Sequence, residues 1–255
     1  MIDANMLMLV PIAFACEFVD SSLGMGYGTM LTPILMLLGY EPFQIVPAVL
    51  VSECFTGITG AFCHHNQKNA YFSRSSMDTK VALVLMIFTI TSTVAAVWIA
   101  SLVPQSIVKI WISVIVIGMG VFLIATWRRK PRFSWFKVCG IGALASFNKG
   151  VSGGGFGPLV MGGQMLSGIG VKNAVGVTSL AEGVTCIVGV IMYLLVWKNA
   201  AWGLAPWITG GALVAVPLAA MTLHHLPERA AKILAAVVIL ALGTATLLKA
   251  VMGHG

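Results

Sequence analysis

Residues Asn148 to Pro158 read Asn-Lys-Gly-Val-Ser-Gly-Gly-Gly-Phe-Gly-Pro and lie between two apolar runs. This stretch carries a lysine, five glycines and two polar side chains in a chain that is otherwise mostly apolar. The stretch from Asp20 to Pro33 reads Asp-Ser-Ser-Leu-Gly-Met-Gly-Tyr-Gly-Thr-Met-Leu-Thr-Pro and is a weaker copy of it. We interpret the two stretches as equivalent parts of one site.

The composition predicts an all-α integral membrane protein. Of the 255 residues, 58% are hydrophobic and only 9% are charged, whereas a soluble domain carries about 25% charged residues. Apolar runs of about 20 residues are therefore interpreted as membrane spans rather than as a buried core. No basic residue precedes the first apolar segment and no small-residue cleavage site follows it, so we expect this segment to be retained.

Charge and cysteine content exclude several classes. The net charge of +7 lies largely in short loops, above all in residues 128–137, as the positive-inside rule predicts for cytoplasmic loops. We therefore expect no nucleic-acid partner. The five cysteines form no Cys-x-x-Cys motif, and we expect neither a metal site nor a disulfide framework. Without a Walker A motif, a nucleotide fingerprint or a Ser-His-Asp set, the sequence predicts no cofactor and no enzyme activity.

Ten apolar segments fall into two sets of five. They cover residues 4–19, 28–40, 42–63, 80–103 and 105–127 in the first set, and 138–147, 157–169, 172–197, 203–223 and 229–251 in the second. The first two segments of each set are too short to cross a hydrocarbon core of about 30 Å. We predict that they form re-entrant helical hairpins over 4–40 and 138–169, with the glycine-rich stretches at their tips.

The two sets align as a repeat of residues 1–127 and 138–255, joined by a basic cytoplasmic linker at 128–137. With an offset of 129 residues, the matched positions are Gly24 and Gly153, Gly26 and Gly155, Tyr27 and Phe156, Gly28 and Gly157, and Glu53 and Glu182. If each hairpin makes no net crossing, each half crosses three times and the halves are inverted relative to one another. The alternative counts each hairpin as one broken span, which gives eight crossings and parallel halves.

Each glycine-rich stretch precedes a predicted helix start, where free N–H groups and the helix dipole favour an oxyanion. The alternative is that these glycines only allow close helix packing. Placing the charge of Lys149 near the midplane of the bilayer would cost free energy, so we expect this residue to be paired or functional. It either contacts an anionic substrate or forms an ion pair with Asp20. The predicted substrate-binding residues are Asn148, Lys149, Ser152, Gly153, Gly154, Gly155, Phe156 and Gly157 in the second stretch, and Asp20, Ser22, Gly26, Tyr27, Gly28 and Thr29 in the first.

Glu53 and Glu182 stand inside otherwise apolar segments. A carboxyl group in such a place either is protonated or pairs with a cation. We predict that these two residues, with Glu17 as a further candidate, couple transport to protons. The alternative is a protonated glutamate that serves only as a hydrogen-bond donor to a neighbouring helix. Two histidine pairs, His64 with His65 and His224 with His225, end or follow predicted helices at the cytoplasmic face, where we expect solvated side chains.

The tip motifs resemble those of the sulfite exporter TauE/SafE family, also called the toluenesulfonate uptake permease group. The second half carries the resemblance through Ser152–Pro158 and through Ala174–Leu180, which reads Ala-Val-Gly-Val-Thr-Ser-Leu. The first half departs from the pattern, because Gly24–Thr29 is less rich in glycine and Pro47–Glu53 replaces the Thr-Ser segment. The resemblance covers essentially the whole chain.

The resemblance implies a multi-pass transporter of the bacterial inner membrane for small sulfur-containing anions such as sulfite or organosulfonates. We expect an ion-coupled secondary transporter that works by alternating access, with export as the expected direction and protons as the coupling ion. Two other classes stay open at this point: a channel for small anions, and a membrane partner subunit that transports nothing. The expected partners are the anion, protons and the lipid bilayer. The sequence leaves open whether the chain forms a homodimer.

Overall fold

The computed structural model describes residues 4–24, 26–73, 76–126, 134–166, 169–197, 202–222 and 228–252. Within these ranges the chain forms ten α-helices and no strands, which confirms the predicted all-α class. The helices are α1 (Ala4–Leu23), α2 (Tyr27–Leu37), α3 (Pro42–Asn66), α4 (Met77–Leu102), α5 (Gln105–Thr126), α6 (Trp135–Ser152), α7 (Phe156–Leu166), α8 (Val171–Val196), α9 (Ala205–Thr222) and α10 (Glu228–Met252). Among the described residues, six helices contain stretches long and apolar enough to cross a membrane, namely α1, α3, α4, α5, α8 and α9.

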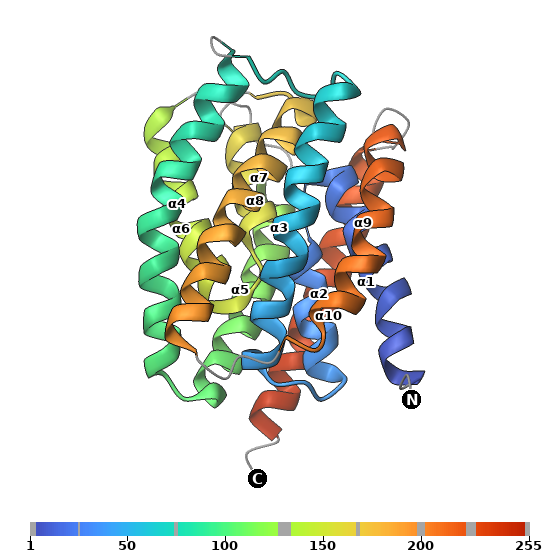
Figure 1. Cartoon of the computed structure of the whole chain (residues 1–255), viewed down its shortest axis with the longest axis vertical. Helices are drawn as coiled ribbons and strands as arrows, with labels where there is room; N and C mark the ends of the chain where they lie inside the picture. The colour runs from blue at the N-terminus through green and yellow to red at the C-terminus, as the bar shows by residue number, and fades with distance from the viewer. Residues whose placement is uncertain are drawn as a thin grey trace.

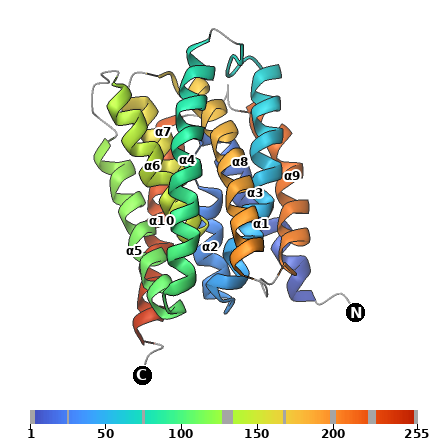
Figure 2. The same ribbon diagram turned by 60° about the vertical axis from the view of Figure 1, so that its left-hand side comes forward.

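The helices run side by side along the long axis of the molecule (Figure 1). Helix α1 begins at the lower end of the bundle in Figure 1, and α2 returns to that end, where α10 also ends. Helices α6 and α7 form a second pair, whose outer ends both lie at the opposite end of the bundle, as Figure 2 shows. The two helix pairs therefore enter the bundle from opposite ends and bring their glycine-rich tips together inside it.

The packing partners of the helices are arranged alike in the two halves. Helix α1 packs on α9 as α6 packs on α4, and α3 packs on α9 as α8 packs on α4. Two further pairs, α3 with α8 and α5 with α10, join the halves directly. Exchanging α1–α5 with α6–α10 maps these contacts onto one another, as two structurally similar halves would require.

Helices α3 and α8 cross closely at two glycines. A Cβ atom on Gly57 of α3 would lie 2.8 Å from the Cα of Gly183 in α8. Glu182 directly precedes Gly183, and Glu53 lies one helical turn before Gly57. The close crossing therefore holds the two intramembrane glutamates on facing helices.

Two of the segments expected to be short are longer in the structure. Helix α1 continues past residue 19 to Leu23, so that Met6–Leu23 is long enough to cross a membrane. Helix α6 runs from Trp135 to Ser152, well beyond the expected 138–147. The reason is that polar residues such as Ser21 and Lys149 interrupt the apolar pattern without ending the helix, because their side chains are buried within the protein. Helices α2 and α7, with 11 residues each, cover only about 16 Å.

Several expectations fall on residues outside the described ranges. These are Met25 in the first tip, most of the basic linker (residues 128–133), and the segment with His224 and His225. The described end of the linker belongs to α6, since Lys137 lies in its first turn.

Candidate anion-binding site

The two glycine-rich tips cross with their backbones in contact. A Cβ atom on Gly28 would overlap the carbonyl oxygen of Gly153, and one on Gly154 would lie 2.7 Å from the carbonyl oxygen of Gly28. Neither position therefore has room for a side chain. The tip backbones also use positive φ angles at matching positions, +67° at Gly24 and +141° at Gly26 in one tip, and +70° at Gly153 and +81° at Gly155 in the other. These angles favour glycine.

Hydrogen bonds fix each tip and join it to the other. The Gly155 N–H donates to Thr29 Oγ1 at 2.9 Å, which links α2 to the start of α7. Within the second tip, the Ser152 hydroxyl donates to the Asn148 carbonyl oxygen at 2.7 Å and accepts from the Gly154 N–H at 3.2 Å. These contacts leave the two tips as one unit made from both halves of the chain.

The Thr29 contact gives a test of this unit. Thr29→Val keeps the shape of the side chain but leaves the Gly155 N–H without its acceptor, which should cost about 1–3 kcal/mol of stability. Thr32 of the same helix is the matched control, because its Oγ1 is buried with no hydrogen-bond partner in the described structure. We expect Thr32→Val to leave the unfolding midpoint of the detergent-solubilised protein unchanged or raise it. Equal midpoints for the two variants would contradict the linking role of Thr29.

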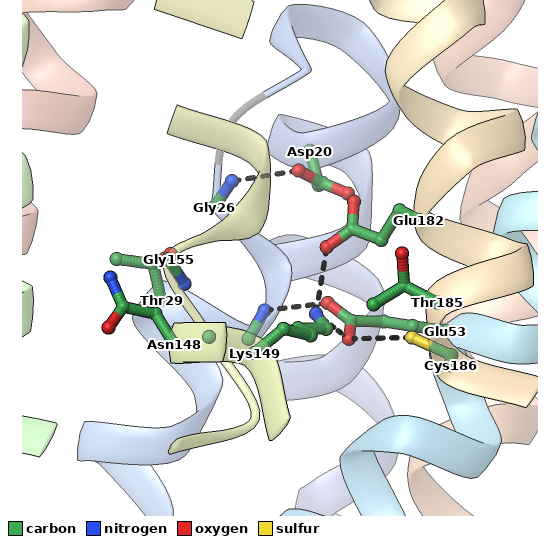
Figure 3. A network of polar contacts seen from close by, with 12 residues as sticks. Asp20, Gly26, Thr29, Glu53, Asn148, Lys149, Gly155, Glu182, Thr185 and Cys186 are labelled. Atoms are coloured by element: carbon green, nitrogen blue, oxygen red, sulfur yellow. Dashed lines mark hydrogen bonds and ion pairs between the residues drawn. The ribbon is translucent and has the colours of Figure 1, made fainter. Parts of the chain in front are cut away.

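Lys149, in the last turn of α6, is the cation at the centre of the site (Figure 3). Its Nζ forms ion pairs with Oε2 of Glu53 on α3 and with Oε1 of Glu182 on α8, the latter at 2.7 Å. All three residues are buried, with exposed fractions of 0% for Lys149, 2% for Glu53 and 5% for Glu182. The ion pair with Asp20 that the sequence left open is not among the contacts of the described residues.

Two carboxyl groups occupy the N-terminus of α2. Asp20 accepts a hydrogen bond from the Gly26 N–H at 2.7 Å, and Glu53 accepts one from the Gly28 N–H at 3.1 Å. Figure 3 shows that the Asp20 side chain also points toward Glu182. The free N–H groups of a helix start, which favour anions, are thus filled in this half by carboxylates of the protein itself.

The N-terminus of α7 is arranged differently. Within the described structure, the N–H groups of Phe156 and Gly157 make no hydrogen bond, and no carboxylate takes the place that Glu53 has at Gly28. Asn148 lies beside this turn, and its buried Oδ1 lacks a hydrogen-bond partner among the described residues. The second half therefore retains unused polar groups at its helix start.

Other predicted site residues have contact partners other than Lys149. The Tyr27 hydroxyl is 2.7 Å from Ser52 Oγ, so its polar group is directed to α3 rather than to the tips. Glu17 accepts a hydrogen bond from Ser21 at 2.6 Å, and its second oxygen is buried without a partner in the described structure, as is the Ser22 hydroxyl. Phe156 is fully buried in the hydrophobic core.

Sequence reasoning missed a group of hydroxyl and thiol side chains around the ion pairs. The Thr89 hydroxyl is 2.9 Å from Ser146 Oγ and 3.0 Å from Thr185 Oγ1, which joins α4, α6 and α8. The Cys186 thiol lies 3.7 Å from Glu53 Oε2. A usable signal was present, because Ser146 precedes Lys149 by three residues, and Thr185 and Cys186 follow Glu182 by three and four. Such spacings place side chains on one helix face.

The expectation of solvated histidines is wrong for His64. This side chain is buried, and Asn69 Nδ2 lies 3.1 Å from its Nδ1. Asn69 also donates to the Ala220 carbonyl oxygen at 3.2 Å, which ties the end of α3 to α9. The physical reason is that the chain after α3 folds back over the helix end instead of leaving it in solvent.

Apolar membrane-spanning helices, with charged side chains buried where two helix tips meet, define a polytopic membrane transporter. The chain belongs to the sulfite exporter TauE/SafE family, which matches residues 9–246. The resemblance found in the sequence is thereby confirmed. Over 229 residues the chain is also 24% identical to a curated relative, the "Probable membrane transporter protein YtnM" of Bacillus subtilis (strain 168), and the match covers 85% of this chain and 74% of the relative.

Proposed function

We propose that this protein is a secondary transporter that exports a small sulfur-containing oxyanion, such as sulfite or an organosulfonate, across the bacterial inner membrane. The anion binds between the two tips, where Lys149 and the N–H groups of the helix starts hold it. Glu53 and Glu182 couple its movement to protons. Membership in the sulfite exporter family supports this substrate class.

The observation that carries this proposal is the burial of Lys149 between Glu53 and Glu182. A lone lysine at this depth would be costly, and here its partners come from both halves of the chain. Sulfite offers acceptor oxygens like those of a carboxylate, so it can take the place of a carboxylate opposite the lysine.

Burial of the site supports alternating access. Lys149 is closed off from solvent, so an anion reaches it only after helices or tips move. The two helix pairs that carry the tips enter from opposite ends of the bundle (Figure 1). Rocking one half of the protein against the other would open the site to one side of the membrane at a time. Lys68, Lys80 and Lys137 lie at the end where α3 stops and α6 starts, which favours this end as the cytoplasmic one.

Purified protein in liposomes tests the function. We expect saturable sulfite uptake that is faster when an inward proton gradient is imposed and that shows counterflow with internal sulfite. Liposomes without protein are the blank, and organosulfonates compete if they share the site. Flux that never saturates and shows no counterflow would replace the transporter by an anion channel. A folded protein without flux of any sulfur oxyanion would favour a partner subunit.

A further inference from the structure

The site holds more acidic groups than basic ones. Glu17, Asp20, Glu53 and Glu182 converge on the region of the tips, and Lys149 is the only cation among the described residues there. The cysteine and tyrosine side chains near this region, which are Cys16, Tyr27, Cys54, Cys186 and Tyr193, are uncharged at neutral pH. His64, which contacts the backbone of Ser21, forms no ion pair among the described residues. A buried cluster with several unpaired negative charges is unfavourable, so some of these carboxyl groups must hold protons.

The carboxyl groups of this cluster occupy positions suited to an oxyanion. Asp20 and Glu53 accept hydrogen bonds from N–H groups at the start of α2. Glu53 and Glu182 form ion pairs with the Lys149 ammonium group. These donors are the same ones that would hold a transported anion. A carboxylate has the charge and the acceptor oxygens of a small monoanion, which makes it a stand-in for one.

We propose that Glu53 and Glu182 are built-in surrogate anions, which the substrate displaces from Lys149 and which bind a proton when they are displaced. The proposal rests on the proposed function and specifies how its anion and its proton are linked. The step makes and breaks no bond within the substrate. A carboxylate oxygen gains a proton from solvent, and the anion takes over the hydrogen bonds and the charge of Lys149.

Charge balance gives the stoichiometry. The Lys149 ammonium group is neutralised by carboxylate before binding and by the substrate afterwards. A carboxylate left buried without its cation would cost several kcal/mol, and protonation removes this cost. We therefore expect about one proton to be taken up for each monoanion bound, because the charge of the buried cluster must stay nearly constant.

Glu182 is the surrogate that leaves first. Glu53 also accepts from the Gly28 N–H and lies near the Cys186 thiol, whereas the one hydrogen bond of Glu182 within the described structure comes from Lys149, at 2.7 Å. In the repeat, Glu182 corresponds to Glu53 and Gly157 corresponds to Gly28. The described structure has no hydrogen bond from the Gly157 N–H to Glu182. The N–H groups at the start of α7 thus offer the incoming anion donors that no carboxylate has taken.

Calorimetry on the full-length purified protein tests the link. The probes are methanesulfonate, which is a monoanion at every working pH, and sulfite in weakly acidic buffer, where bisulfite predominates. Titrations in two buffers with different ionisation enthalpies report the protons taken up. We expect about one proton per anion bound, so that affinity rises about tenfold for each unit by which the pH falls. Binding without proton uptake would overturn the proposal.

Isosteric variants test the surrogate role itself. Glu182→Gln and Glu53→Gln each remove one competitor for Lys149, so we expect each to bind methanesulfonate about tenfold more tightly than the wild type, a gain of about 1.4 kcal/mol. Glu41→Gln is the matched control, because Glu41 pairs with Lys109 at 2.7 Å on a partly exposed surface, and we expect no change in its affinity. A purely structural role for the glutamates predicts weaker or unchanged binding in the variants.

The outcomes separate this inference from the proposed function. Sulfite flux in liposomes together with proton-independent binding would support the transport function and contradict the surrogate role of the glutamates. Proton-linked binding without flux would support the surrogate role and contradict the transport function. If neither the wild type nor the two glutamine variants bind either probe, the surrogate role is wrong, because freeing Lys149 should expose the anion site. Thermal unfolding of each variant verifies its fold, and the proton stoichiometry of the wild type needs no variant.

Discussion

Lys149→Met is expected to lower the affinity for sulfite by at least about a hundredfold, equivalent to about 2.7 kcal/mol, and to abolish transport. Methionine fills similar space but supplies no charge and no donor to the anion. Truncating one partner of a buried, hydrogen-bonded charge pair costs about 2–5 kcal/mol, so the expected loss lies within the usual range. Calorimetry of sulfite binding and flux in liposomes measure the two effects.

A loss of stability alone must be separated from a loss of binding. Lys109→Met is the control for removing a lysine, because Lys109 is paired with Glu41 away from the tips, and this variant should transport normally. The double variant Lys149→Met with Glu182→Gln removes one carboxyl group that would be left without its cation. We expect it to unfold at a higher temperature than Lys149→Met and still to bind no sulfite. Normal transport by Lys149→Met would contradict the substrate contact.

Gly28→Ala is expected to destabilise the fold by more than about 3 kcal/mol, at or beyond the upper end of the usual cost of overpacking. The added methyl group would overlap the Gly153 carbonyl oxygen, and a backbone atom cannot move aside as a flexible side chain can. Since the tips carry the site, sulfite binding should be lost with the fold. The measurements are the yield of monodisperse protein in detergent and its thermal unfolding midpoint.

Gly140→Ala is the matched control for this substitution. Gly140 lies in α6, and a Cβ atom there would meet no atom within 4 Å, so the change should be neutral or stabilise the helix by up to about 1 kcal/mol. Similar effects of the two substitutions would contradict the backbone crossing of the tips. Gly154→Ala should resemble Gly28→Ala, because it meets the same crossing from the other half.

The helical class and the location of the tips could be predicted because both depend on local patterns. Long apolar runs predict spans, and clustered glycines before Pro158 predict a helix start, which the structure places at Phe156. The expected ends of α1 and α6 are wrong because hydropathy treats residues such as Ser21 and Lys149 as solvent-facing. Whether such a residue faces lipid, water or protein depends on tertiary packing, which the sequence pattern alone does not specify.

The sequence could point to the charged residues that the structure brings together, but not to the ion pairs that they form. The sequence singles out Lys149, Glu53 and Glu182, but it offers Asp20 as the alternative partner of Lys149, because the repeat places these two at matching positions. The observed pairing arises from the crossing of α3 and α8, a contact between residues far apart in sequence. The inverted repeat and the proton coupling stay predictions that the experiments above address.

The crossing of the tips also has a consequence for how the chain is made. Asp20 and Glu53 are synthesised and inserted long before Lys149, since the ribosome adds about 5–20 residues per second. Until α6 arrives, the first half has carboxyl groups in the bilayer without their cation, and protonated carboxyl groups are far cheaper there than charged ones. We therefore expect these carboxyl groups to hold protons until α6 is in place, and the ion pair of Lys149 with Glu53 to release a proton as it forms.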